Sequence, residues 1–492
     1  MTGPRLGFMA AAIAALLCLA SSAPEAQPTT ADGVTVGASD LGGVVRSAQG
    51  PEAGVWVIAE TTDLPTKFIK IVVTDDRGRY LIPELPKAGY SVWVRGYGLV
   101  DSPKVRSAPG RLLNLTAVVA PTAAAAAEYY PAQWWYSMMK IPDKSLFPGT
   151  GPAPKGNGMS DRVKTQGQWL SGILSQGCGS CHQLGNKPTR TIEPRLGKFA
   201  SSYDAWLHRM QIGPAAEIMV RNISALDSQI ALKNFADWTD RIAKGELPKS
   251  KPNRPRGKER NVVITMWDWA RPTDYLHDEV ATDRRNPTVN AYGKIYGATE
   301  DATDLVPVLD PVTHTATQIK LVTRTPVKPR GMFISQQVGF VNLPSPYWGD
   351  QQLWGSHTTP HNPMFDHKGR VWFTSRIREA QTPAFCRKGS DHPSARLFPI
   401  ERAGRQLSMY DPETGKLTLI DTCFTTHHLN FAEDENHTLW LSAGGFRAGY
   451  VGWFNTRLFD QTGDEQRAQG LVADRARHQR QRPPRRRLCR AE

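Results

Sequence analysis

The residue types and spacing best suited to chemistry lie at Cys178-Gly179-Ser180-Cys181-His182. Two thiols separated by two residues and followed directly by a histidine are typical of c-type haem attachment. In such a site both sulfurs form thioethers with the haem vinyl groups, and the histidine binds the iron from the proximal side. Imidazole is a suitable iron ligand. The motif therefore predicts one covalent haem c, held by Cys178 and Cys181 with His182 on the iron.

Two other uses of paired cysteines explain this segment less well. A thioredoxin-like redox pair needs a βαβ context and leaves the adjacent histidine unexplained. A zinc site needs four ligands, usually with a second Cys/His pair close by, and no such pair follows in the sequence. An export signal, described below, also favours haem over these alternatives.

The second axial ligand of the iron is less sharply indicated. A methionine opposite the histidine is usual in soluble electron carriers and raises the reduction potential. Met219 follows a proline-containing loop 37 residues after His182, so it is the preferred candidate, with Met210 as the alternative. His208 or an open position are further options, and an open position would favour ligand binding or peroxide chemistry. Either methionine could instead simply fill a core.

Helical patterns flank the motif on both sides. Trp169 and Ile173 recur at helical spacing within residues 160–176, and a second apolar face runs along residues 226–243. The order of helix, CxxCH motif and closing aromatic helix resembles a small class I cytochrome c domain over residues 155–248. The resemblance implies an all-α domain that carries single electrons.

Length and composition place the motif in a larger soluble protein. The chain has 492 residues, enough for about three or four domains, and 40% hydrophobic with 22% charged residues is ordinary for globular proteins. The net charge is +14, but residues 471–492 hold eight arginines against two acidic residues. Since six of the fourteen charges lie in this short tail, the rest of the chain has no nucleic-acid-binding footprint.

Residues 1–26 are typical of a secretory signal peptide. An apolar run, Leu6–Leu19, follows Arg5 and precedes small residues, and it is shorter than the about 20 residues that span a membrane. A retained membrane anchor is the alternative. No later stretch approaches spanning length, so the sequence predicts a periplasmic or secreted protein without a transmembrane segment after signal removal.

Residues 38–120 carry short β-branched and alternating runs between Gly, Pro and Asp turns, which predicts a β-sandwich. Residues 75–78 are expected to form one of these turns. The order Gly-Val-Val, Gly-Val-Trp-Val, Thr-Asp-Asp-Arg-Gly-Arg-Tyr and Gly-Tyr-Ser-Val-Trp-Val resembles the carboxypeptidase regulatory-like domain. The resemblance implies an immunoglobulin- or transthyretin-like sandwich of the carbohydrate-binding-like group. Its role is expected to be structural, with carbohydrate binding as the alternative.

Two segments are expected to connect the domains. Residues 121–154 begin with Pro-Thr and five alanines, which predicts a linker or short helix. The aromatic stretch at 129–136 is expected to be an apolar strap between two domains, with a ligand platform as the alternative. Residues 249–260 are basic and proline-containing, so they predict a solvated hinge, with binding of an acidic partner as the alternative.

Residues 261–460 contain a loose β-repeat. Its apolar-aromatic pairs are 76 and 68 residues apart: Ile295-Tyr296, Val371-Trp372 and Leu439-Trp440. Blades usually repeat every 40–50 residues or so, which indicates inserted loops or a degenerate blade between the pairs. The pattern of His, Asp, Gly-x-(Val/Leu)-Trp and Asp-Pro-x-Thr-Gly resembles β-propellers of the streptogramin lyase-like and NHL-like kind. That resemblance implies a partial propeller in which Asp411–Gly415 is a hairpin turn.

Four histidines would then lie near blade starts: His277, His361, His427 and His428. They are expected to hold loops by hydrogen bonds, or alternatively to line a metal or substrate site. The resemblance implies a divalent metal held by His and Glu in lyases of this kind. Cys386 and Cys423 flank the Asp411 turn and could form a disulfide in an oxidising compartment, with free buried thiols as the alternative.

Residues 461–492 are expected to be disordered because their arginine-rich end cannot bury a core. About three repeats precede them, whereas propellers close with 4–8 blades. The tail is therefore interpreted as frame-shifted or truncated. A natural basic tail that docks an acidic partner is the alternative.

Together these patterns predict a multidomain, mainly β protein with a small all-α domain. The expected function is single-electron transfer through one haem c, with a redox partner protein or a small-molecule electron donor. The β-domains would orient the haem edge, because the protein supplies ligation, burial and orientation. The alternatives are a haem-dependent oxidoreductase acting on an organic substrate bound by the propeller, and a lyase-like propeller or carbohydrate-binding module that carries the cytochrome as an accessory.

Overall fold

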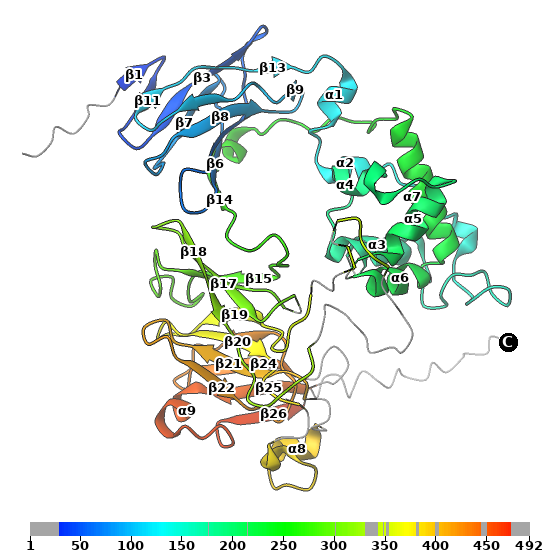
Figure 1. Cartoon of the computed structure of the whole chain (residues 1–492), viewed down its shortest axis with the longest axis vertical. Coiled ribbons are helices and arrows are strands. Elements are labelled where there is room, and N and C mark those ends of the chain that lie inside the picture. The colour runs from blue at the N-terminus through cyan, green and yellow to red at the C-terminus, as the bar shows by residue number, and fades with distance from the viewer. Residues whose placement is uncertain are drawn as a thin grey trace, which may run out of the picture.

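The computed structural model describes residues 29–175, 177–213, 215–300, 302–329, 343–347, 349–350, 354–379, 383–398, 403–443 and 450–473. The predicted signal peptide and the arginine-rich residues 474–492 lie outside this part of the chain. The architecture is mainly β and multidomain, with one group of helices between the β regions (Figure 1). The expected fold class is confirmed at this level.

The amino-terminal β-module consists of two sheets that enclose one apolar core. The strands of the first sheet, in spatial order, are β10 (Val105–Ser107), β8 (Tyr90–Arg95), β5 (Trp56–Thr61), β6 (Phe68–Val73) and β14 (Ile264–Trp267). In the second sheet β3 (Leu41–Ser47) pairs with β11 (Arg111–Leu112), β12 (Leu115–Thr116), β4 (Gly50–Pro51) and β7 (Arg79–Ile82). Two further strand pairs are β1 (Thr29–Ala31) with β2 (Val34–Val36), and β9 (Leu99–Val100) with β13 (Val118–Val119).

Alternation along the strands explains this sandwich. In β6 every second side chain is buried, as expected for a strand with one face on a core. The predicted turn at 75–78 is present: Asp75 Oδ1 accepts backbone N–H groups of Arg77 and Arg79. Gly78 has a φ of +74° there, a conformation that favours glycine.

The strand β14 differs from the prediction, which assigned residues from 261 onward to the β-repeat. It pairs antiparallel with β6 and extends the amino-terminal sheet. The basic segment before it, residues 249–260, contains η4 (Gly257–Arg260) and is mostly exposed to solvent. Arg254 forms an ion pair with Glu52, and Arg260 forms one with Asp76. Two basic side chains of this segment are thus paired within the chain, whereas its three lysines are exposed.

The helical domain follows the amino-terminal β-module. Its elements are α1 (Ala123–Ala127), α2 (Ala132–Tyr136), η1 (Lys144–Leu146), α3 (Gln166–Leu174), η2 (Cys178–Ser180), α4 (Lys187–Arg190), η3 (Pro194–Leu196), α5 (Ser202–Gln211), α6 (Ala216–Ser224) and α7 (Ser228–Ala243). Side-chain caps begin the longer helices: Thr165, Ser201 and Asp227 accept backbone N–H groups at the starts of α3, α5 and α7. Trp169 and Trp238 are fully buried in the core of this domain. Among the described residues no helix is long and apolar enough to cross a membrane.

The aromatic stretch at 129–136 joins the β-module to the helical domain. Tyr129 Oη accepts the backbone N–H of Asp101 on the β-module, at 3.1 Å. Trp135 is buried and accepts, at its carbonyl, the Trp238 indole N–H at 2.8 Å. The stretch therefore connects the two domains as an apolar strap, and residues 121–154 are an ordered part of the structure.

Three four-stranded antiparallel sheets follow in the described residues, each with its strands in chain order. They are β15 (Asp278–Val280), β16 (Ile295–Ala298), β17 (Leu305–Asp310) and β18 (Thr315–Lys320); β19 (His361–Phe365), β20 (Val371–Ser375), β21 (Gln406–Tyr410) and β22 (Leu417–Ile420); β23 (Leu429–Phe431), β24 (Thr438–Ala443), β25 (Tyr450–Asn455) and β26 (Gln469–Ala473). Each of the three predicted apolar-aromatic pairs lies in the second strand of its sheet, and the predicted turn Asp411–Gly415 joins β21 to β22. The first strands β15, β19 and β23 are in contact in this order.

The predicted start of disorder at residue 461 is wrong for the described residues 461–473. Helix α9 (Thr456–Thr462) leads into β26, which pairs with β25 over five residues. Ala468 is fully buried and Leu471 packs against the core of the last two sheets. The arginine-rich composition that suggested disorder begins only after β26. The prediction was wrong because it assigned the short apolar run of this strand to the arginine-rich tail.

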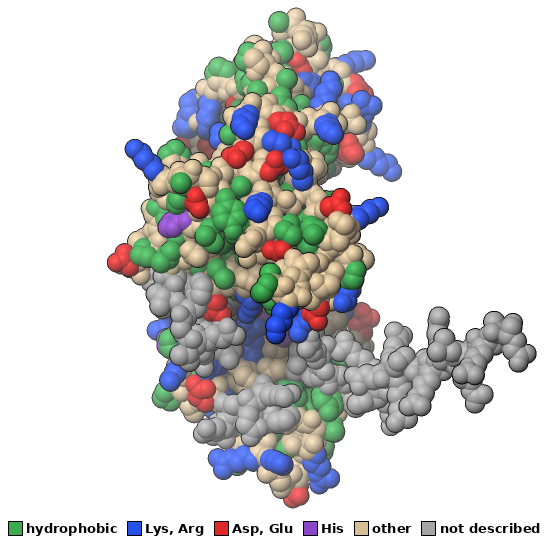
Figure 2. Space-filling view, turned by 90° about the vertical axis from the view of Figure 1, so that its right-hand side faces the viewer, with side chains coloured by type: hydrophobic (Ala, Val, Ile, Leu, Met, Phe, Trp, Pro, Cys, Tyr) green, Lys and Arg blue, Asp and Glu red, His purple; other side chains and the backbone are tan. Residues whose placement is uncertain are grey.

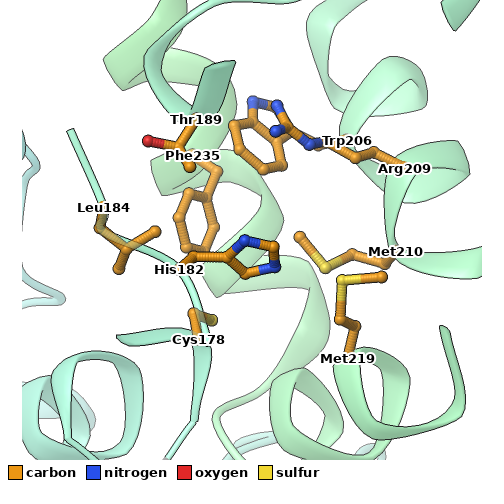
Figure 3. Close-up of a pocket in the computed structure, with 9 residues that line it drawn as sticks. All are labelled: Cys178, His182, Leu184, Thr189, Trp206, Arg209, Met210, Met219 and Phe235. Atoms are coloured by element: carbon orange, nitrogen blue, oxygen red, sulfur yellow. The ribbon is translucent and has the colours of Figure 1, made fainter. Parts of the chain in front are cut away.

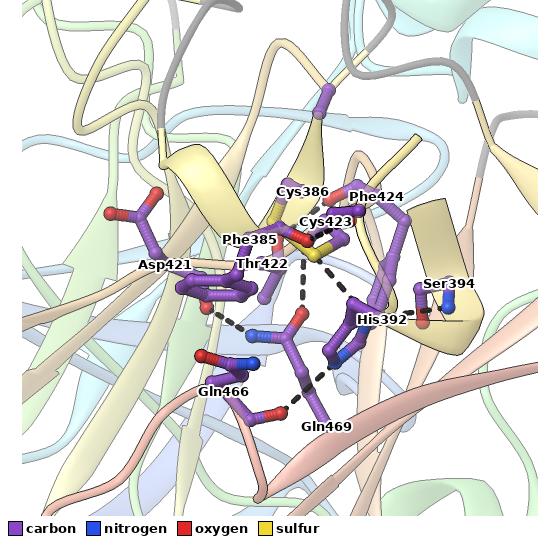
Figure 4. Close-up of a disulfide and its surroundings, with 12 residues drawn as sticks. Phe385, Cys386, His392, Ser394, Asp421, Thr422, Cys423, Phe424, Gln466 and Gln469 are labelled. Atoms are coloured by element: carbon purple, nitrogen blue, oxygen red, sulfur yellow. Dashed lines mark hydrogen bonds between the residues drawn. A yellow bond between two sulfur atoms is a disulfide. The ribbon is translucent and has the colours of Figure 1, made fainter. Parts of the chain in front are cut away.

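Cys386 and Cys423 form a disulfide (Figure 4). Of the two alternatives that the sequence left open, a disulfide or free buried thiols, the structure contains the disulfide. Cys386 ends η5 (Ala384–Cys386), a short helical turn in the insertion between β20 and β21 that also contains α8 (Pro393–Leu397). Both cysteines are fully buried. His392 lies beside the bridge, with Nδ1 3.6 Å from Cys423 Sγ and Nε2 3.0 Å from the Gln466 carbonyl oxygen. The bridge therefore ties the insertion to the core.

Candidate functional site

The Cys178–His182 segment is held against the end of α3. Cys178 begins η2, and its carbonyl oxygen accepts the backbone N–H of His182 at 2.9 Å and of Cys181 at 3.3 Å. Gly179 is required by close packing, because a Cβ atom there would lie 1.8 Å from the Leu174 carbonyl oxygen. The tight turn brings Cys178 and His182 to one wall of the helical domain.

A small apolar cavity opens beside the motif (Figure 3). Its lining is mostly apolar and comes from residues far apart in the sequence: Cys178, His182, Leu184, Thr189, Trp206, Arg209, Met210, Met219 and Phe235. The packing of α5 against α7 brings Trp206 and Phe235 together, with ring centroids 4.7 Å apart. The cavity thus lies between the motif and the core of this domain.

Both candidate methionine ligands line this cavity. Met210 lies near the end of α5 and Met219 lies in α6. Figure 3 shows the two thioether sulfurs beside the His182 ring. His208 is also on α5, but its ring packs against Phe199, 5.3 Å away, and does not line the cavity. The structure therefore brings Met219 and Met210 to the motif and leaves His208 outside.

Two more cavities, both open to solvent, adjoin the first. All three share Leu184 in their linings, and the largest also reaches His182 and Gly179. Tyr136 and Leu174 line both of the additional cavities. The motif is thus flanked by space with largely apolar walls, which suits a planar apolar group attached to Cys178 and partly open to solvent.

Partial desolvation shifts the pKa values at the motif, where Cys181 and His182 still have solvent-exposed surface. It lowers the pKa of His182, and the nearby Arg209 cation lowers it further, which favours the neutral imidazole needed for a metal ligand. Burial raises the pKa of Cys178 to about 11. Reactive redox cysteines have lowered pKa values, so this thiol does not fit a thioredoxin-like pair.

Arg209 is a functional candidate that the sequence did not single out. It lines the apolar cavity, and burial lowers its pKa although Tyr347 and Glu193 act in the opposite direction. Its guanidinium donates to the Pro188 carbonyl oxygen at 2.6 Å and lies 4.8 Å from the Trp206 ring centroid. No motif marked this arginine, because its place depends on how α5 packs.

The β-region also touches the helical domain close to the motif. The backbone N–H of Leu343 donates to the carbonyl oxygen of Gln211, the last residue of α5, at 2.9 Å. Tyr347 Oη donates to Glu193 at 2.7 Å. Burial raises the pKa of Tyr275, and the adjacent Cys181 thiol raises it further. Tyr275 therefore places the β-region against the second cysteine of the motif.

The four histidines of the β-repeat converge at one place, which we call the histidine cluster: His277, His361, His427 and His428. Each lies at or just before the first strand of its sheet, as predicted. Hydrogen bonds hold part of the cluster: His361 Nδ1 lies 3.1 Å from the His427 carbonyl oxygen, and His277 Nδ1 lies 2.9 Å from Asp278. Burial, together with the neighbouring imidazoles, lowers the pKa of His427 to about 4. Burial also lowers the pKa of His361, whereas the hydrogen bond to Asp278 raises the pKa of His277.

Comparison with known proteins found no family model and no curated protein that matches the sequence.

Proposed function

We propose that the protein is an exported monohaem c-type cytochrome that transfers single electrons. Cys178 and Cys181 would hold the haem covalently, and His182 would be the proximal iron ligand. The observation that carries the proposal is the position of the motif on an apolar cavity where His182 faces two thioethers. When bound, the haem supplies one-electron redox chemistry at its iron.

The chain's own residues would serve that group in distinct ways. Apolar side chains such as Leu184, Trp206 and Phe235 exclude water from the cavity. Arg209 supplies a positive charge at the cavity wall, suited to an acidic substituent of the porphyrin. Met219 is the proposed distal ligand, with Met210 as the alternative, because both sulfurs lie beside the His182 ring.

The finer domain assignments belong to the same proposal. We assign the helical residues 155–248 to a cytochrome c fold, and the amino-terminal sheets to a carboxypeptidase regulatory-like sandwich. The last three sheets are assigned to a partial β-propeller, because their first strands adjoin one another and their strands run in chain order. This order is typical of blades.

Partner and location follow from charge and from the disulfide. On the face in Figure 2, basic and acidic side chains are intermixed over the described surface, which favours a redox protein or small electron donor over nucleic acid. The Cys386–Cys423 disulfide is typical of an oxidising compartment. The disulfide supports a periplasmic or secreted location.

The test is intact-mass spectrometry of denatured protein produced with haem-attachment machinery. We expect one covalent haem per chain, absent in the Cys178→Ala/Cys181→Ala double variant. The matched control is Cys386→Ala/Cys423→Ala, which removes the other cysteine pair and should retain the adduct. A colourless product after competent maturation, or pigment that acid extraction releases, would refute the proposal.

The distal ligand is tested by a pair of variants. Loss of the near-infrared sulfur-to-iron band in Met219→Ala, with the band retained in Met210→Ala, supports Met219. The reverse result assigns Met210. Retention of the band in both variants would reject both assignments, since either sulfur would then be dispensable.

A haem-dependent oxidoreductase is the second candidate function. The observation that favours it is the contact between Tyr275 and Cys181, which places the β-region next to the motif. In that case an organic substrate alone would reduce the protein. If no organic substrate reduces the protein in the absence of a partner protein, the result favours a simple electron carrier.

A further inference from the structure

The histidine cluster is the strongest feature outside the haem motif. His277 directly precedes β15, His361 opens β19, and His427 and His428 directly precede β23. The His361 ring lies at the centre, with its centroid 4.8 Å from that of His277 and 4.4 Å from that of His427. The His428 ring centroid is 5.2 Å away. Contact between the first strands therefore gathers four imidazoles at one end of the three sheets.

The two ring nitrogens of His361 have different surroundings. Nδ1 lies 3.1 Å from the His427 carbonyl oxygen, so Nδ1 carries a proton that it donates. Nε2 is buried and has no hydrogen-bond partner among the described residues. A histidine that donates one ring N–H to a backbone carbonyl and offers the other nitrogen is the usual arrangement of a metal ligand.

Charged groups of both signs surround this nitrogen: the Asp278 and Glu300 carboxylates and the Arg405 guanidinium. Asp278 Oδ2 lies 3.4 Å from His361 Nε2, without hydrogen-bond geometry between them. The Arg405 guanidinium supplies one positive charge nearby, where it donates to Thr359 Oγ1 at 3.2 Å and to Glu300 Oε1 at 3.3 Å. A metal ion bound beside Asp278 would give Nε2 the partner that it lacks among the described residues. The Asp278 carboxylate is itself held in place by the backbone N–H of Asn362 at 3.0 Å.

Two sets of ligand atoms share His361. One set joins it to His427 and His428, and the other joins it to His277 and Asp278. Within each set the ligand atoms lie within 4.8 Å of one another. Ligand atoms around a tetrahedral ion with bonds of about 2.0–2.1 Å are about 3.3 Å apart, so small side-chain rotations suffice to close the site.

Backbone strain supports a specialised role for this region. Thr359 and Asn362, on either side of His361, have φ values of +43° and +48°. Residues other than glycine rarely adopt such values, and a β-branched threonine least of all. Strained residues of this kind concentrate at functional sites.

We propose that the histidine cluster binds one first-row divalent transition-metal ion at His361 Nε2. His427 and His428 supply imidazoles from one side, and Asp278 supplies a carboxylate from the other. Imidazole ligands suit copper and zinc, and affinity in such sites is highest for Cu²⁺. Cu²⁺ is therefore expected to bind more tightly than Zn²⁺.

The site is close to the proposed haem attachment. The Tyr275 ring centroid lies 5.8 Å from that of His277, and the Tyr275 hydroxyl neighbours Cys181. One tyrosine side chain thus separates the histidine cluster from the motif. The metal proposal itself does not depend on haem, since none of its ligands belongs to the motif.

The test measures bound copper, zinc and iron by elemental mass spectrometry after equilibration of the full chain with Cu²⁺ or Zn²⁺ and gel filtration. We expect one Cu²⁺ per chain in the wild-type protein and in Cys178→Ala/Cys181→Ala, which isolates this result from the haem proposal. Competition should show Cu²⁺ displacing Zn²⁺. Nitrogen couplings in the Cu²⁺ electron paramagnetic resonance spectrum identify imidazole ligands.

Two variants of the cluster are needed, because a substitution at a buried histidine could reduce Cu²⁺ binding simply by disturbing the fold. His361 is fully buried, so His361→Gln is accompanied by His428→Gln at an exposed position. We expect at least a tenfold loss of Cu²⁺ affinity in His428→Gln, with unchanged circular dichroism. His437→Gln is the matched control, since His437 pairs with His367 outside the cluster. Equal Cu²⁺ binding in wild type and His428→Gln, or no binding by the wild type, would overturn the proposal.

Discussion

Removal of the Cys386–Cys423 disulfide is expected to destabilise the last two sheets selectively. The bridge closes a loop of 37 residues that includes α8, β21 and β22. In the chain-entropy treatment a loop of this size stabilises the native state by about 4 kcal/mol. The Cys386→Ala/Cys423→Ala variant should lose that contribution, because its unfolded chain is no longer restricted.

Hydrogen–deuterium exchange followed by mass spectrometry is the appropriate assay, since it reports each region separately in a multidomain chain. A loss of about 4 kcal/mol corresponds to exchange roughly a thousandfold faster for the slowest amides of β20–β24. Peptides from β5–β8 serve as the internal control and should not change. Wild-type protein unfolded and refolded under reducing conditions should match the variant. Unchanged protection in β20–β24 would refute the reasoning.

Three other perturbations test the packing. Trp238→Phe removes the indole donor of a buried hydrogen bond to a carbonyl of α2, so we expect a loss of about 1–3 kcal/mol in thermal unfolding; an unchanged midpoint would contradict it. Trp267→Ala removes the indole N–H that donates to His314 at 3.0 Å, and proteolysis within residues 268–274 should accelerate, whereas an unchanged cleavage rate would argue against this contact as a tether. Burial raises the pKa of Asp304, but its hydrogen bonds outweigh this and lower it overall. Its stabilisation is therefore present above the unfolded value of about 3.9 and lost as the pH falls below it. The difference in melting temperature between wild type and Asp304→Asn should shrink from pH 7 to pH 3; a constant difference would exclude the titration.

Much of the local structure was predictable from residue patterns. The turn at 75–78, the hairpin turn Asp411–Gly415 and the helices flanking the motif depend on neighbouring residues, and the structure contains all of them. The apolar-aromatic pairs marked the second strand of each late sheet for the same reason. Local composition gave a wrong prediction at the boundary between the last sheet and the arginine-rich tail, because the strand β26 was assigned to the tail.

Some residues of the candidate site were predictable from local sequence, and others were not. Cys178, Cys181 and His182 are contiguous, so their order alone predicts haem attachment, which stays a prediction. Arg209 and Tyr275 reach the motif through contacts between distant segments, and no local pattern marks them.

Sequence by itself determined which chemical groups this protein carries and roughly where its strands and helices begin. Only the tertiary structure decided that β14 joins the amino-terminal sheet and that four separated histidines share one place. The physical reason is that strand pairing and side-chain convergence depend on contacts between residues about 50 to 200 positions apart. Closing such long loops costs chain entropy, and only the packing of the whole chain offsets that cost.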